Sequence, residues 1–212
     1  MKFFSLDRSL KLFLLGVSLC SFLISAEYGI TRPASNAIFL TYFGVDFFPY
    51  AWLATLPLNF IIVSLYNRIL PRIGCQRTFL GVISLVILVH AISGYLIPYY
   101  PGVSFFHYIW KDIYILLMFK QLWSLIHSTI NTQNAKFVYG FLFGIGAVGG
   151  VLGSLVPSFL AVKLGSEKLF FLAIPIYLLI YLCYMFAYKK SKVEIPSATF
   201  ETTSPFKVIA NS

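Results

Sequence analysis

The sequence has little charge, and most of that charge has one sign. Of its 212 residues only 11% are charged, with 7 acidic against 16 basic side chains and a net charge of +9. Hydrophobic residues make up 59% of the chain and aromatic residues 18%. A soluble domain of this length could not hide so much apolar surface from water. The composition therefore excludes an ordinary soluble globular protein.

Groups that enzymes and metal sites need are also scarce. The three cysteines, Cys20, Cys75 and Cys183, are far apart and show neither metal-ligand spacing nor a disulfide framework. There is no nucleophile elbow, phosphate loop with its lysine, or pair of neighbouring carboxylates, and the few acids leave few general bases. We therefore expect no enzymatic activity, no metal and no cofactor.

The basic residues do not form a nucleic-acid site. They are spread singly along the connections between apolar runs, without a basic stripe, which indicates membrane topology and contact with anionic lipid. We expect the lipid bilayer as a partner and no nucleic acid.

Long apolar runs dominate the chain. A bilayer core of about 30 Å needs about 20 apolar residues per helix, and six stretches meet that requirement. They lie near Leu10 to Thr31, Phe47 to Asn67, Thr78 to Pro98, Trp110 to Asn131, Phe137 to Val162, and Leu169 to Tyr188. The sequence predicts an all-α polytopic membrane protein, with a six-helix transmembrane domain at residues 1–188 and a disordered cytoplasmic tail at residues 189–212.

The first run has a second interpretation. Lys2, Arg8 and Lys11 followed by Leu12 to Ala26 also fit a signal peptide cleaved after Ala26. Ile24 is bulky where the cleavage site prefers a small residue, and five more runs follow. We therefore favour an uncleaved first helix.

The basic residues predict which way the chain crosses the membrane. Ten of them fall on one side of the predicted bundle: Lys2, Arg8, Lys11, Arg68, Arg72, Arg77, Lys136, Lys189, Lys190 and Lys192. The other side holds Arg32, Lys111, Lys163 and Lys168. Because cytoplasmic loops are enriched in Lys and Arg, we expect a multi-pass protein of the cell inner membrane with both termini in the cytoplasm. Arg68, Arg72 and Arg77 then form a cytoplasmic gate loop.

Three ionisable residues are candidates for positions inside the membrane. An ionised side chain at mid-bilayer costs roughly 2.5–3.5 kcal/mol on insertion scales, so those that occur there usually face a bundle interior or a water-filled cavity. Glu27 lies in the first span, Arg32 near the outer end of that span, and Lys120 in the fourth. Arg32 could also reach the interface, whereas Lys120 lies too deep.

A polar stripe accompanies Lys120. On a helix of 3.6 residues per turn, Lys120, His127 and Asn131 share one face. This face could line a pore, or His127 and Asn131 could approach the cytoplasmic headgroups. The candidate substrate-binding residues are thus Glu27, Arg32, Lys120, His127 and Asn131.

The fifth run is rich in glycine. Gly146 and Gly150, like Gly149 and Gly153, are separated by four residues. Small residues at this spacing let two helix backbones approach closely. We expect these four glycines to serve helix packing.

Three segments carry a resemblance to a known family. They are Arg32 to Leu40 with Tyr42 to Tyr50; the basic stretch Asn67 to Arg77; and Leu122-Trp123 with Asn134-Ala135-Lys136 and Gly140 to Gly153. In this order and spacing they resemble the ATP:ADP antiporter family of nucleotide transporters and related bacterial proteins of the major facilitator type. The chain departs from that pattern at Ser35-Asn36 and at Phe137. The resemblance covers about residues 10–188, one six-helix half of a twelve-helix fold.

The resemblance implies a function. It predicts a half-size transporter, built from two three-helix repeats, that moves an anionic solute such as ATP or ADP by alternating access. Arg32 and Lys120 would attract the anion, with Glu27 as their counter-ion or proton site. Because one half cannot enclose a cavity, the chain should form a homodimer or join a second six-helix half. The alternative is a remnant of a split transporter that only binds membrane partners.

Overall fold

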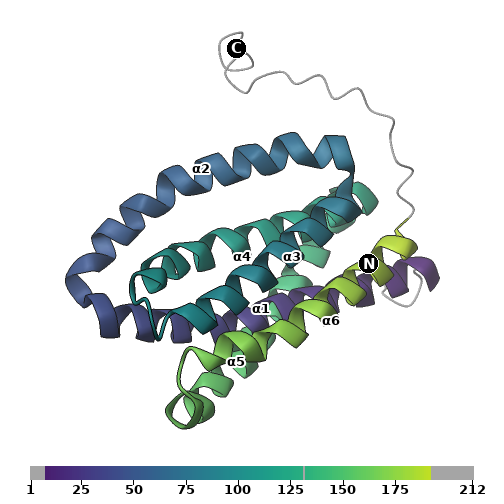
Figure 1. Cartoon of the computed structure of the whole chain (residues 1–212). Coiled ribbons are helices and arrows are strands. Elements are labelled where there is room, and N and C mark those ends of the chain that lie inside the picture. Colours follow the sequence, from purple (N-terminus) through teal and green to yellow (C-terminus); the bar gives the residue numbers. More distant parts are fainter. Residues whose placement is uncertain (1–7, 131, 192–212) are drawn as a thin grey trace.

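The computed structural model of the chain describes residues 8–130 and 132–191, and over these residues it is entirely helical (Figure 1). The helices are α1 (Arg8–Phe43), the short 3-10 helix η2 (Val45–Phe47), α2 (Phe48–Ile73), α3 (Cys75–Leu96), α4 (Gly102–Thr129), α5 (Thr132–Leu164) and α6 (Lys168–Lys190). The predicted all-α class is confirmed for this part. Most of the predicted tail and Lys2 lie outside the described residues.

Five of the six long helices are long and apolar enough to cross a membrane, namely all except α4. That helix carries Lys111, Asp112 and Lys120 together with several other polar side chains. Much of α4 is nevertheless buried inside the bundle, so its polar groups meet other helices. The described chain therefore has the helices of a multi-pass membrane protein.

Helices α1 and α4 extend furthest beyond their predicted ends. Helix α1 continues past Thr31 and through Pro33 to Phe43, where Gly44 ends it with a φ of 77°. A glycine adopts a positive φ without steric cost. Helix α4 begins at Gly102, directly after Pro101, eight residues before the predicted start of the span at Trp110. Arg32 and Lys111, which the sequence places at the ends of the first and fourth spans, therefore lie well inside α1 and α4.

Helix α1 lies at the centre of the bundle. It packs against α4, α5 and α6, while α3 packs against α4 and α6. Helix α5 also contacts α6, and α2 contacts α3 and α4. Figure 1 shows α2 arching away from the other helices, and its buried residues are only Ala51 and Tyr66. The chain thus forms a bundle with one loosely attached helix.

The helix ends fall into two groups. At one end Ser9 donates a hydrogen bond to the Lys190 carbonyl at 3.3 Å, and Cys75 Sγ lies 2.9 Å from the Tyr184 hydroxyl. This end, with the α2–α3 turn and its arginines, is called the basic end below. The turns at the opposite end span residues 44–47, 97–101 and 165–167, which include two acids and no base. Lys163 and Lys168 flank the last of these turns, so this end carries fewer bases than the basic end but is not free of them.

Candidate functional site

Helices α1 and α5 meet through small residues. A Cβ atom placed on Gly149 or Gly153 would overlap the backbone oxygens of Phe22 and Ala26 on α1. One on Gly146 would lie 3.0 Å from the hydroxyls of Ser21 and Ser25, whereas Gly150 has more room. The backbones approach this closely because these positions have no side chain. Helix α5 therefore covers the face of α1 that carries Phe22 and Ala26, and the other faces of α1 remain available to line a groove or the bundle interior.

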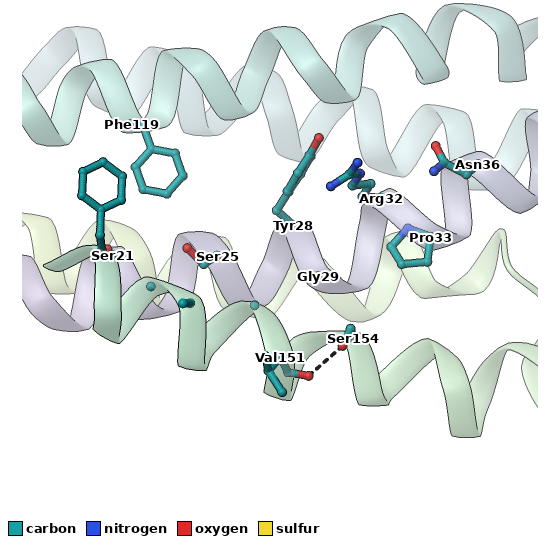
Figure 2. A pocket seen from close by; sticks show the side chains of 14 residues that line it. Ser21, Ser25, Tyr28, Gly29, Arg32, Pro33, Asn36, Phe119, Val151 and Ser154 are labelled. Atoms are coloured by element: carbon teal, nitrogen blue, oxygen red, sulfur yellow. Dashed lines mark hydrogen bonds between the residues drawn. The ribbon is translucent and has the colours of Figure 1, made fainter. Parts of the chain in front are cut away.

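A groove of about 710 Å³ runs along the remaining edge of this helix pair. Figure 2 shows Tyr28 and Arg32 projecting from α1 into the space that Phe119 enters from α4. The polar side chains in it are those of Ser21, Ser25, Tyr28, Arg32, Asn36 and Ser154. On α1 they recur every three or four residues, so they occupy one face of the helix.

Two further hollows adjoin this groove. One of about 840 Å³ shares Phe119 with it and contains Lys120, Trp123 and His127. The other, of about 280 Å³, shares Arg32 and Asn36 with it and contains Lys111 and Asp112. We call the three together the α1–α4 groove. It runs along one face of the bundle and contains Arg32, Lys120 and His127.

Lys120 is half-buried on α4 and does not meet Glu27. Its Nζ donates a hydrogen bond of 2.6 Å to Asn67 Oδ1 on α2 and lies 5.1 Å from the centre of the Tyr66 ring. The expectation that Glu27 could serve as its counter-ion is wrong in this structure, because Glu27 on α1 faces the interior of the bundle whereas Lys120 on α4 faces the groove. Within the described residues no carboxylate lies within 4.0 Å of Lys120.

Arg32 is exposed in the groove. Its guanidinium carbon lies 5.8 Å from the centre of the Tyr28 ring, a cation–π contact. The Tyr28 hydroxyl donates to Asp112 Oδ1 at 2.8 Å, and Lys111 Nζ donates to the other oxygen of that carboxylate at 2.9 Å. Asp112 is thus already paired with a lysine. Among the described residues Arg32 has no ion-pair partner within 4.0 Å.

Glu27 points the other way, into the interior of the bundle, where it is 1% exposed. The Tyr114 hydroxyl on α4 lies 3.1 and 3.2 Å from its two carboxylate oxygens and 2.6 Å from the Thr31 hydroxyl. His90 Nε2 on α3 is 3.8 Å from Glu27 Oε1 and 3.2 Å from the Tyr177 hydroxyl on α6. Four helices therefore surround one carboxyl group.

A second buried histidine continues this cluster. His107 on α4 lies with its ring centre 5.0 Å from that of His90, and its Nδ1 is 3.3 Å from the Ser35 hydroxyl. Its Nε2 is buried and has no hydrogen-bond partner in the part of the chain that the structure describes. Glu27, Thr31 and Ser35 are spaced four residues apart, so they form the interior face of α1, which differs from the groove face.

The other predicted site residues lie toward the basic end. His127 is exposed at the end of α4, with its ring stacked on Trp123. Arg68, Arg72 and Arg77 are all exposed beside the α2–α3 turn. Asn131 lies outside the described residues. In the described part of the chain no three possible metal ligands come together.

Sequence reasoning missed the partners of Glu27. His90, Tyr114 and Tyr177 all stood within apolar runs without a signal that distinguished them. The four-residue spacing of Glu27, Thr31 and Ser35 was the one available hint of a polar interior face. Comparisons with known protein families, with curated proteins and with solved structures found no match to this chain.

Proposed function

We propose that this protein is a half-size membrane transporter that moves an anionic solute, such as a nucleotide, by alternating access. The main observation behind this proposal is that Arg32 and Lys120 line the same groove and have no acidic partner among the described residues. Basic groups in otherwise apolar helices are costly unless they meet water or an anion. An anionic solute in the α1–α4 groove would supply the missing negative charge.

The helix packing supports a facilitator-type arrangement. If α1, α2 and α3 are exchanged with α4, α5 and α6, each main packing pair maps onto another pair or onto itself. For example, the α1–α5 contact becomes α4–α2, and the α1–α6 contact becomes α4–α3. Two equivalent three-helix repeats would produce this pattern, and transporters of this kind place their sites between repeats. Here the central helices of the two repeats would be α1 and α4.

The open groove also indicates a partner. Its charged residues cannot face lipid tails without cost, so a second polypeptide should cover it. We propose a homodimer or a complex with a second six-helix half, in the inner membrane and with the basic end in the cytoplasm. Cross-linking in native membranes followed by mass spectrometry would identify the partner. Proteoliposomes that each hold a single copy of the chain and still take up solute would contradict this assembly.

The alternative is a transporter remnant that only associates with other membrane proteins. The observation that favours this alternative is the large apolar surface of α2, where Trp52, Leu56 and Phe60 are exposed. Such a surface could equally face lipid. An uptake measurement distinguishes the two functions, because sealed vesicles that contain a mere remnant would not take up any solute.

The test is uptake of radiolabelled ATP and ADP into proteoliposomes. Lys120→Met keeps most of the side-chain length and removes the charge, so uptake should fall by at least about tenfold if one charge contact of about 1.4 kcal/mol or more is lost. Insertion and thermal stability should change little, because Asn67 stays solvent-accessible. Lys163→Met, at the exposed end of α5, is the matched control and should transport normally. No uptake of either nucleotide by the native protein would favour the remnant.

A further inference from the structure

We propose that Glu27 and His90 form a proton-binding site on the interior side of α1, and that this site couples proton movement to anion occupancy of the α1–α4 groove. The coupling rests on the proposed transport function, whereas proton binding itself does not. The carrying observation is a carboxyl group and an imidazole 3.8 Å apart, both buried at the centre of four helices.

The hydrogen bonds of His90 fix its resting state. Its Nδ1 lies 2.9 Å from the Val86 carbonyl, which can only accept, so Nδ1 carries a hydrogen. In the neutral ring Nε2 is then an acceptor, and the Tyr177 hydroxyl at 3.2 Å is placed to donate to it. An added proton on Nε2 would face Glu27 Oε1. One additional proton can thus bind either to the carboxylate of Glu27 or to Nε2 of His90.

The charge balance sets the two states of the site. With one added proton the pair has no net charge, either as a carboxylic acid beside neutral imidazole or as a carboxylate beside imidazolium. When that proton leaves to water, one buried negative charge stays behind. Only hydroxyl donors then stabilise it, and burial of an uncompensated charge is costly. The site therefore gains or loses one proton as its electrostatic surroundings change.

The titratable groups around Glu27 come from four helices. They are Tyr28 on α1 itself, His90 on α3, Tyr114 and His107 on α4, and Tyr177 on α6. Helix α5 faces α1 with glycines and Ser154, none of which has a titratable side chain. Two cations can act on this cluster: Lys111, one turn from His107 on α4 and already paired with Asp112, and Arg32, five residues beyond Glu27 on α1 at about 7–8 Å of axial rise.

Arg32 provides the link between the two faces of α1. While its charge is unpaired, the positive potential favours the ionised form of Glu27. An anion bound in the groove neutralises that potential, so the site should then take up a proton. By thermodynamic linkage, proton binding strengthens anion binding by the same factor. The proton and the anion should therefore cross the membrane together, as in a proton–anion symporter.

The polar residues also indicate the side from which the proton enters. From Glu27 they continue through Thr31 and Tyr114 to Ser35 and His107, toward the end opposite the basic end. Among the described residues His107 Nε2 has no hydrogen-bond partner, so it can accept or pass on a proton in this line. We therefore expect the proton to enter from the side opposite the basic end.

Infrared spectroscopy of the purified protein tests proton binding without a solute. A pH titration should show a carbonyl stretch at the high frequency typical of a carboxyl buried away from water, distinct from that of the exposed acids, which Glu27→Gln removes and His90→Gln shifts along the pH axis. Asp46→Asn, the same exchange at an exposed acid in η2, should retain that band. If the native band is absent at every pH, or survives in Glu27→Gln, the proton site is refuted.

Proteoliposomes test the coupling. With labelled ATP as the probe and a pH-sensitive dye inside, each uptake event should acidify the interior, and an inward proton gradient should drive accumulation. Glu27→Gln should still exchange ATP but should no longer respond to the gradient. Uptake that is independent of the gradient in the native protein would overturn the coupling. A normal carboxyl band without ATP uptake would instead count against the proposed function alone.

Discussion

The ammonium group of Lys120 donates a 2.6 Å hydrogen bond to the side-chain oxygen of Asn67, which ties α4 to the loosely packed α2. A neutral amide satisfies one donor of the ammonium but does not neutralise its charge. Lys120 therefore keeps its positive charge available in the α1–α4 groove. An anion could replace Asn67 as the hydrogen-bond acceptor, which would release α2 from this contact.

The orientation can be tested with two engineered thiols. In a variant without the three native cysteines, Val45→Cys and Ile73→Cys each place a thiol at an exposed aliphatic position in a turn, at opposite ends of the bundle. With the basic end in the cytoplasm, an impermeant maleimide should label Val45→Cys in intact cells and Ile73→Cys only after permeabilisation. The reverse order would mean that the protein is inverted. Native Cys75 is a poorer probe, because its thiol is half-buried against Tyr184.

The α1–α5 contact should not tolerate a methyl group. Gly153→Ala places a Cβ atom in overlap with the Ala26 carbonyl, so the helices must separate. We expect a loss of about 1–3 kcal/mol or more of stability, as for overpacked cores. Thermal melting in detergent would measure it.

Gly144→Ala is the matched control on the same helix. Its added Cβ would meet no atom within 4 Å, so stability should be unchanged or slightly higher. Equal melting temperatures for the two variants would show that this contact contributes little to the fold.

Gln121 is the centre of a second buried network, near the basic end. Its amide nitrogen lies 2.8 Å from both the Cys75 carbonyl and the Tyr184 hydroxyl, and its oxygen accepts from Tyr66. Gln121→Leu removes the acceptor of the buried Tyr66 hydroxyl, whereas Tyr184 keeps its contact with Cys75 Sγ, so the change should cost about 1–3 kcal/mol for the one group left unsatisfied. In the double variant Gln121→Leu/Tyr184→Phe the loss of unfolding free energy should be smaller than the sum of the two single losses, because both changes remove the same hydrogen bond between these residues. Strict additivity in unfolding experiments would exclude a connected network.

The sequence predicted the number and order of the helices because apolar runs longer than the bilayer thickness are a strong signal. It was wrong about the end of α1, because the first apolar run stops near Thr31 whereas the helix continues through Pro33 to Phe43. In the structure Pro33 lies on the groove face, where the missing backbone hydrogen bond is not enclosed by packing. Gly44 ends the helix instead, through its backbone conformation.

The site was predictable only in part. Lys120 and Arg32 stood out because charge is rare in these helices, and the structure places both on the α1–α4 groove. The partner of Lys120 could not be predicted, because Asn67 lies on α2 and nothing local specifies which helix α4 will face. The environment of Glu27 likewise depends on how α3, α4 and α6 surround α1, which is set by side-chain packing rather than by periodicity.

Accessibility of the groove tests the central claim most directly. In the cysteine-free background, Ser25→Cys places a thiol in the groove, whereas Leu179→Cys places one on the exposed surface of α6. If the groove is a water-filled anion path, a small charged thiol reagent should modify Ser25→Cys and not Leu179→Cys, and ATP or ADP should slow that reaction. Ser25→Cys that is unreactive from both sides of the membrane, or reacts at the same rate with and without either nucleotide, would contradict the account.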